Sequence, residues 1–203
     1  MRKATKEILL ITGNKDKLNE FQSILSSSSL SLTSINIDLP EYQGNPLDIA
    51  KMKAKFAFNI VKKPLIVEDA SLCFNALNGL PGPYIKWFLQ ELKPAGIVKM
   101  LAGYEDKSAY AQCIIAYMSE ELEDPLCFIG QTPGLIALPI SPIQGWNWNQ
   151  NSLWPFQPEG YSRTYQELPA DVKNKISHRS RAIHKMIEYF ENSQEGENKQ
   201  SQA

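Results

Sequence analysis

Short apolar runs alternate with segments of helical periodicity over the first third of the chain. Residues 8–11 are apolar, a break follows at Gly13-Asn14, and apolar residues then recur at three- and four-residue steps as far as Leu25. The elements predicted here are a strand over 7–12, a helix over 15–25, a strand over 30–37, a helix from Asn45 to about Val61 and a buried strand over 65–67. Such alternation is typical of an α/β fold.

The remainder of the chain has longer strands and more loop. The elements predicted here are helical segments over 84–101, a strand over 109–118, a hairpin of strands 126–130 and 134–138, and a closing helix over 177–190. Residues 139–168, rich in Pro, Trp and Asn, are predicted to be mostly loop. We find no repeat or linker, so we expect a single domain over 1–191 and a disordered polar tail over 192–203, which has no apolar anchor.

Composition narrows the classes of function. The 203 residues suffice for one domain with a sizeable core, and a formal net charge of −1 argues against a broad basic surface for nucleic acid. The three cysteines have no metal-ligand spacing and are expected to be buried thiols in a reducing compartment. The sequence has no evident signal peptide or membrane span, so we expect a cytoplasmic protein that binds neither nucleic acid nor a membrane.

The turn between the first strand and the first helix is a candidate phosphate site. Gly13-Asn14 places several backbone N–H groups at the positive end of a helix, and Lys17 in the first turn adds a mobile positive charge. The turn is not a Walker loop, because G-x-x-x-x-G-K-[ST] occurs nowhere in the chain. Turns of this kind are common, so a purely structural role is the alternative.

Three acids are candidates for metal binding and water activation. Glu68 and Asp69 directly follow the predicted strand over 65–67, and Glu41 follows the second predicted strand. Because ligands of open α/β sheets bind beyond the carboxyl ends of strands, we expect Asp69 to bind Mg2+ and to orient an attacking water. The alternative is a solvated junction between strand and loop.

Lys53 is expected to face inward. Ile49, Phe56 and Ile60 form a narrow apolar stripe on the second predicted helix, and three- and four-residue steps place Lys53 inside that stripe. Because burying an unpaired ammonium group is costly, an inward lysine indicates a phosphate or a carboxylate partner. The alternative is a side chain that extends outward to solvent.

Two further segments carry donor side chains. Lys86 follows the rigid turn Leu80-Pro81-Gly82-Pro83, and Ser177-His178-Arg179 opens the last predicted helix. His178 and Arg179 are both donors, which suits a carbonyl oxygen on a ligand. The alternatives are a surface lysine after a structural loop, and a helix-capping serine followed by exposed polar residues.

Six segments, taken together and in this order, resemble the inosine triphosphate pyrophosphatase family, whose members remove non-standard purine nucleotides. The matching segments are Thr12-Gly13-Asn14 with Lys17, Leu39-Pro40-Glu41-Tyr42-Gln43-Gly44, Val67-Glu68-Asp69, Leu80-Pro81-Gly82-Pro83-Tyr84-Ile85-Lys86-Trp87-Phe88, Gly103-Tyr104-Glu105-Asp106-Lys107-Ser108-Ala109 and Ser177-His178-Arg179. They extend over residues 7–190. The resemblance implies an elongated two-lobed α/β fold with a long twisted mixed β-sheet and a deep nucleotide cleft, usually as a homodimer.

The resemblance also implies an activity, a cofactor and a set of site residues. The activity is hydrolysis of ITP, dITP and XTP to the monophosphate and pyrophosphate, with Mg2+ or, as the alternative ion, Mn2+. The triphosphate would be held by the turn Thr12-Gly13-Asn14-Lys15-Asp16-Lys17, assisted by Lys53 and Lys86. Glu41 and Asp69 would be the metal ligands, and Asp69, assisted by Lys53, the water-activating acid. Lys173, His178 and Arg179 match the positions that hold the purine.

One segment departs from the family. Its base-pocket motif, Phe-Gly-Trp-Asp, corresponds here to Gln144-Gly145-Trp146-Asn147, which lacks the first ring and the carboxylate; Trp154-Pro155 is the alternative counterpart. Ala70 stands beside Asp69 where a hydroxyl residue is usual. The alternative function is therefore a nucleotide-binding homologue with lost or shifted base specificity.

Overall fold

The structure, a computed structural model, describes residues 6–140 and 155–200, with side chains up to residue 193. The strands are β1 (Lys6–Ile11), β2 (Leu30–Ile35), β3 (Leu65–Phe74), β4 (Pro81–Gly82), β5 (Ser108–Met118), β6 (Leu126–Ile136) and β7 (Phe156–Pro158). The helices are α1 (Lys15–Leu25), α2 (Pro46–Val61), α3 (Ile85–Lys99), α4 (Ala170–Ile176) and α5 (His178–Gln200), with a 3-10 turn at Asn75–Leu77.

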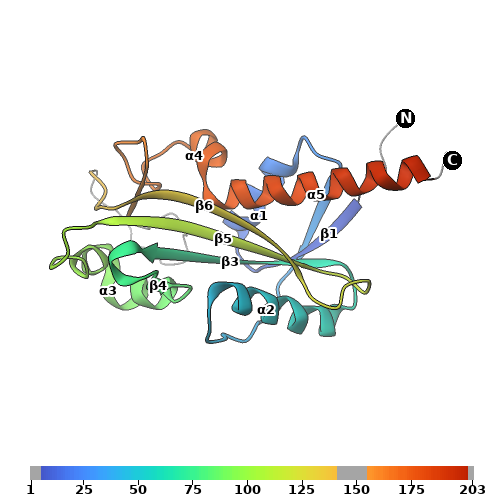
Figure 1. The fold of residues 1–203 in the computed structure, drawn as a ribbon, viewed down its shortest axis with the longest axis horizontal. Coiled ribbons are helices and arrows are strands. Elements are labelled where there is room, and N and C mark those ends of the chain that lie inside the picture. Colours follow the sequence, from blue (N-terminus) through green and yellow to red (C-terminus); the bar gives the residue numbers. More distant parts are fainter. Residues whose placement is uncertain (1–5, 141–154, 201–203) are drawn as a thin grey trace.

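The strands form one open, mixed sheet of seven strands in the order β2-β1-β3-β5-β6-β7, and β4 pairs with the end of β3. β1 is parallel to β2 and β3, and the remaining pairs are antiparallel. The long strands β3, β5 and β6 twist along an elongated molecule, as Figure 1 shows. The expected α/β fold with a long mixed sheet is therefore confirmed.

The two lobes arise because β1 and β4 pair with different parts of β3. β1 ends opposite Val67, whereas β4 begins to pair at Leu72. Residues 68–71 of β3 therefore have no strand partner on this side within the described part of the chain. β1, β2 and α1 lie on one side of this gap, and β4 and α3 lie on the other (Figure 1).

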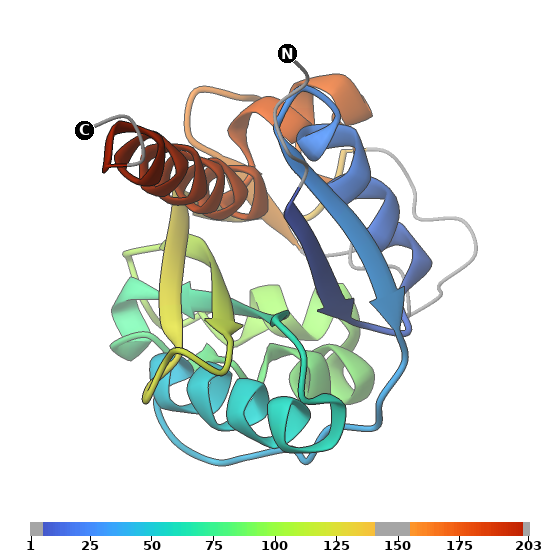
Figure 2. The same ribbon diagram turned by 90° about the vertical axis from the view of Figure 1, so that its right-hand side faces the viewer.

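Helices cover both faces of the sheet, as Figure 2 shows. α1 and α5 pack on one face over a core that includes Phe21, Ile66 and Ile183. α2 packs on the opposite face through Ala50, Ala54 and Ala57, whose small side chains allow the helix to lie close to the sheet. The apolar core beneath the second lobe is a separate cluster that includes Phe74, Ile97 and Phe156.

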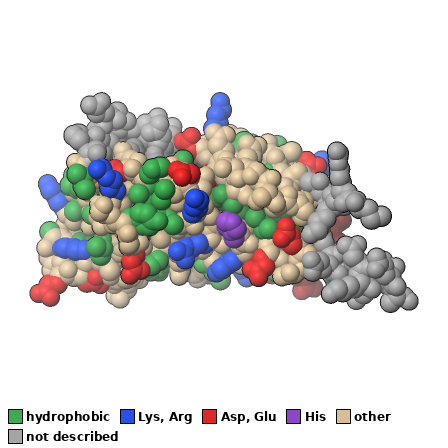
Figure 3. All heavy atoms as spheres, turned by 90° about the horizontal axis from the view of Figure 1, so that it is seen from above, with side chains coloured by type: hydrophobic (Ala, Val, Ile, Leu, Met, Phe, Trp, Pro, Cys, Tyr) green, Lys and Arg blue, Asp and Glu red, His purple; other side chains and the backbone are tan. Residues whose placement is uncertain are grey.

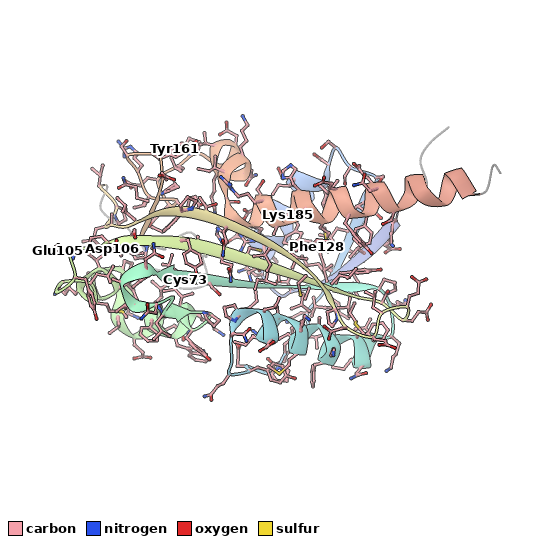
Figure 4. The ribbon with its side chains drawn as sticks, viewed as in Figure 1. Cys73, Glu105, Asp106, Phe128, Tyr161 and Lys185 are labelled. Atoms are coloured by element: carbon pink, nitrogen blue, oxygen red, sulfur yellow. The ribbon has the colours of Figure 1, made fainter. Side chains whose placement is uncertain are left out.

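α5 is anchored to β6 by several contacts. Lys185 Nζ donates a hydrogen bond to the Ile129 carbonyl at 2.7 Å, and the Phe128 ring lies 5.6 Å from that of Tyr189. Figure 4 shows Lys185 and Phe128 at this crossing. A Cβ atom on Gly130 would stand 2.0 Å from the His178 carbonyl oxygen, so only glycine fits where the helix starts. These contacts fix the first turn of α5 over the sheet.

Two predicted strand boundaries were wrong. β3 continues to Phe74, so Glu68 and Asp69 lie within a strand rather than beyond its end. The predicted hairpin is instead the single strand β6, with residues 131–133 inside it. Both strands are long because antiparallel β5 supplies ten consecutive register partners to each. Pro133 has no N–H to donate, and it faces the β7 side next to the last residue that pairs with β7, where its carbonyl accepts from the Glu159 N–H at 2.9 Å.

The closing helix also differs from expectation. α4 precedes it, and α5 extends to Gln200 rather than ending near Phe190. Most of the segment predicted to be a disordered tail is thus helical, since helix propagation costs little once the first turns are packed. That residues 1–191 form a single domain stays a prediction. Among the described residues, no helix is long and apolar enough to cross a bilayer.

Candidate active site

Lys53 joins two carboxylates beneath the open part of β3. Its Nζ donates to Asp69 Oδ1 at 2.8 Å and to Glu41 Oε2 at 3.2 Å, and Lys86 Nζ on α3 donates to Glu41 Oε1 at 3.0 Å. The side chains of Lys53 and Asp69 are only 13% and 12% exposed. Glu41, Lys53 and Asp69 line a hollow of about 210 Å³ whose other walls include Tyr42, Tyr84 and Trp87. The four predicted residues therefore form one cluster.

The inward direction of Lys53 was predicted correctly, but from the wrong stripe. Ile60 is 56% exposed, and the buried face of α2 consists of Ile49, Ala50, Ala54 and Ala57. Lys53 lies four positions from both Ile49 and Ala57 and so shares their face. Its observed partners are carboxylates, one of the two alternatives that the sequence left open.

Burial and charge oppose each other in this cluster. Burial raises the pKa of Asp69, and the charge and hydrogen bond of Lys53 offset only part of that effect. Burial also acts to raise the pKa of Glu41, but hydrogen bonds and charge from Lys86 and Lys53 outweigh it, and the pKa is lowered. Burial acts to lower the pKa of Lys53, yet Asp69 and Glu41 leave it raised. The cluster thus holds a cation between two acids of unequal proton affinity.

The turn after β1 is ordered by its own side chains. Asn14 Oδ1 accepts hydrogen bonds from the backbone N–H groups of Asp16 and Lys17 at 2.9 and 3.2 Å, which caps α1. Thr12 Oγ1 accepts from the Asn14 N–H at 3.1 Å. A Cβ on Gly13 would stand 2.6 Å from Asn36 Oδ1. Residues 12–14 therefore form a tight turn at the end of β1, and Lys15 and Asp16 are exposed in the first turn of α1.

On the opposite face of β3, Lys17 does not stand free for a phosphate but forms a close ion pair with Glu68 Oε2. Glu68 Oε1 accepts from Arg179 Nε and Nη2 at 3.2 and 3.0 Å. Arg179 Nη1 in turn donates to Glu20 Oε2 at 2.6 Å. Although burial disfavours both charges, the pairing lowers the pKa of Glu68 and raises that of Arg179. Adjacent strand residues point to opposite faces, so Glu68 and Asp69 belong to different clusters.

His178 and Lys173 lie beside this ion-pair cluster. The buried His178 ring stacks on that of Tyr165 with 5.9 Å between centroids. Burial, with the positive charge of Arg179 adding to it, lowers the pKa of His178 to about 3, so the ring is neutral at pH 7. Burial likewise lowers the pKa of Lys173, with the charge of Arg179 adding and that of Glu20 opposing. The three residues predicted to hold a purine are thus brought together.

The remaining predicted residues divide into two groups. Ala70 follows Asp69 on β3, in the part of that strand with no partner on the β1 side among the described residues. Gln144, Gly145, Trp146 and Asn147 lie outside the described residues. Glu20, which pairs with Arg179, was not predicted, although its position three residues after Lys17 on one helix face places it beside the same ion-pair cluster.

A second basic region lies on the outer side of α4 and α5. Lys175, Arg181, His184 and Lys185 border a groove of about 740 Å³ over β5 and β6. Figure 3, which looks onto this side, shows Lys and Arg side chains gathered around a histidine. Arg181 is exposed here, two positions from buried Arg179, and it therefore offers a control for substitutions at Arg179.

Comparison with known proteins places this arrangement in a family. The Ham1 protein of Staphylococcus aureus has a TM-score of 0.75 at 24% identity, covering 93% of this chain and 100% of its own. A HAM1 protein from Coxiella burnetii has a TM-score of 0.76 at 26% identity with the same coverage. A nucleoside-triphosphatase, dITP/XTP pyrophosphatase, of Mycobacterium abscessus has a TM-score of 0.65 at 25% identity, covering 89% of this chain and 98% of its own.

The family model agrees with these structures and with the resemblance drawn from the six sequence segments. The model of the Ham1 family matches residues 8–189, which include most of β1, the acids of β3 and just over half of α5. The chain therefore belongs to the Ham1 family, the family of the inosine triphosphate pyrophosphatases.

Proposed function

We propose that this protein hydrolyses non-canonical purine nucleoside triphosphates, namely ITP, dITP and XTP, to the monophosphate and pyrophosphate, with Mg2+. The observation that carries the proposal is the pair Lys53–Asp69, held with Glu41 in a hollow beside the open part of β3. Membership of the Ham1 family and the activity named for the Mycobacterium abscessus protein support it.

The residues present suit a magnesium ion. Mg2+ usually binds through one or two carboxylates and keeps water and substrate phosphate oxygens as its other ligands. Glu41 and Asp69 supply two such carboxylates, and no group of three or more acids, cysteines or histidines forms a metal cluster among the described residues. When bound, the ion would neutralise charge on the pyrophosphate leaving group.

The chain's own residues can perform the hydrolysis step. Asp69, whose pKa is raised by burial, is placed to accept the proton of a water that attacks the α-phosphorus as the bond to pyrophosphate breaks. Lys53 in this hollow, and Lys86 paired with Glu41 beside it, would bring positive charge to the place where the leaving group develops negative charge. A base and cations for the phosphate thus lie in and beside the hollow.

Purine selection is assigned to the opposite face. Arg179 uses three of its five N–H groups on Glu68 and Glu20, which leaves two for a ligand. His178, whose buried ring is neutral, lies beside Arg179. N–H groups at this position would donate hydrogen bonds to the 6-keto oxygen of hypoxanthine or xanthine, whereas the adenine amino group would meet another donor.

The alternative is a nucleotide-binding homologue with lost or shifted base specificity. It is motivated by Gln144 and Asn147, which replace a ring and a carboxylate of the family motif. The intact Lys53–Asp69 pair favours catalysis instead. Homodimeric assembly, a cytoplasmic location and the use of Mn2+ stay predictions.

The test is pyrophosphate release from a panel of nucleoside triphosphates, with Mg2+ and after its removal by a chelator. ITP, dITP and XTP should be hydrolysed faster than ATP and GTP, and only with the metal. Asp69→Asn should lower turnover by about 10²–10⁴-fold, as expected for the loss of a general base, while ITP still binds. Asp124→Asn, which changes an exposed acid paired with Lys51 and Lys55, is the control. Near-normal turnover of Asp69→Asn would refute the assignment.

A further inference from the structure

Glu68 is the centre of a buried set of four charged side chains. It receives Lys17 on one carboxylate oxygen and two N–H groups of Arg179 on the other, and Arg179 continues to Glu20. The Cys113 thiol lies 3.4 Å from the same Oε1 atom. The four charged side chains come from α1, β3 and α5, and Cys113 comes from β5, so the set forms only when both layers of this lobe are in place.

The burial of this set is unusually deep for charged groups. The side chains of Glu68, Arg179 and Glu20 are 1%, 4% and 10% exposed. An ion pair that is buried so completely seldom stabilises a protein more than apolar side chains of the same volume would. Loss of one partner, however, leaves the other as an uncompensated buried charge. Fixing the direction of a functional guanidinium group is a role that an apolar replacement could not fulfil.

We propose that Glu68 is a positioning residue that sets base selectivity by fixing the Arg179 guanidinium, and that it takes no part in metal binding or water activation. This inference rests on the proposed function of Arg179 as a purine contact. Arg179 Nε and Nη2 both donate to Glu68 Oε1, and Nη1 donates to Glu20, so three contacts to two carboxylates hold the guanidinium group. Lys17 forms an ion pair with the other oxygen of the Glu68 carboxylate.

Metal binding and water activation, the two alternative roles for Glu68, disagree with its position in the structure. Asp69, its neighbour, points to the other face of β3, where Lys53 and Glu41 lie. The carboxylate of Glu68 is already occupied by Lys17 and Arg179. A Gln side chain at position 68 would keep the shape but could present an N–H group toward Arg179 or Lys17, so donor would face donor. The guanidinium would then lose its fixed direction.

The experiment measures binding of inosine and adenosine monophosphates by calorimetry. In Glu68→Gln the ratio of the two affinities should fall by about tenfold relative to the wild type, chiefly through weaker inosine monophosphate binding. The control Asp124→Asn should keep the wild-type ratio. Equal weakening of both ligands, which is what a merely structural role predicts, would overturn the proposal, as would a wild type without any preference.

A double-mutant cycle sharpens the assignment. If Glu68 acts through Arg179, Glu68→Gln should change the ratio by less than about twofold once Arg179→Lys is present. Additive effects of the two substitutions on the affinity ratio would contradict an action of Glu68 through Arg179. Should Glu68→Gln fail to fold, Glu68→Asp keeps the charge but shortens the reach, and a ratio within about twofold of wild type would then reject the proposal. Because monophosphates are not hydrolysed, ITP turnover by the wild type tests the proposed function separately.

Discussion

The buried histidine at the start of α5 should make this protein sensitive to acid. Burial, with the charge of Arg179, lowers the pKa of His178 from 6.5 to about 3. In that interval the unfolded chain binds a proton at this residue and the folded protein does not. The free energy of unfolding therefore rises with pH between the two values, and the stabilisation is lost as the pH falls through them.

The magnitude follows from the shift. Over the interval the slope from one such group approaches about 1.4 kcal/mol per pH unit, so acidification by two units from pH 6.5 should cost about 2–3 kcal/mol from this residue alone. His178→Phe keeps an aromatic ring against Tyr165 and removes the titration. The variant should lose less stability than the wild type over the same acidification.

The measurement is urea unfolding of both proteins at several values between about pH 4.5 and pH 7.5, with stability plotted against pH. Carboxylates contribute the same background to both curves, so the difference between the curves isolates His178. The matched control is His184→Phe, which changes the exposed histidine of the same helix. Parallel curves for wild type and His178→Phe would refute the assignment of a neutral, buried ring.

Three further predictions concern the two charged clusters and the helix crossing. Lys53→Met should raise the KM for ITP by about 10- to 100-fold, since a charge-assisted contact contributes about 1.5–3 kcal/mol. The control Lys55→Met removes a lysine that is paired with exposed Asp124 and should leave the KM unchanged. Equal KM values for the two variants would contradict the role of Lys53. Arg179→Ala should destabilise the fold by about 3–5 kcal/mol in urea unfolding, because Glu68 and Glu20 lose a buried partner. The same substitution should narrow the preference for ITP over ATP, and Arg181→Ala is the control. An unchanged preference would exclude Arg179 as a purine contact. Gly130→Ala should lower the free energy of unfolding by about 1–3 kcal/mol, since its Cβ would meet backbone atoms of α5 at 2.0 and 2.5 Å. The measurement is thermal unfolding, and a melting temperature equal to that of the wild type would show that α5 can move away from β6 at no cost.

The elements that the sequence determined are those fixed by contacts within a few residues. α1 was predicted with its observed bounds, and α2 with its start, because Asn14 and Asn45 each cap the helix that follows with their own side-chain oxygens. The motif order was likewise sufficient to indicate the family. An inward Lys53 followed from helical periodicity, which is a local geometric property.

Tertiary structure decided what each of those residues contacts. The lengths of β3 and β6 depend on β5, which lies between them in the sheet, so neither could be set from its own residues. Glu68 and Asp69 are adjacent in sequence, yet they belong to opposite faces because the strand continues through them. The pair Arg179–Glu20 joins residues 159 positions apart. Such partners are chosen by how helices pack across a sheet, and single-residue patterns carry no record of that packing.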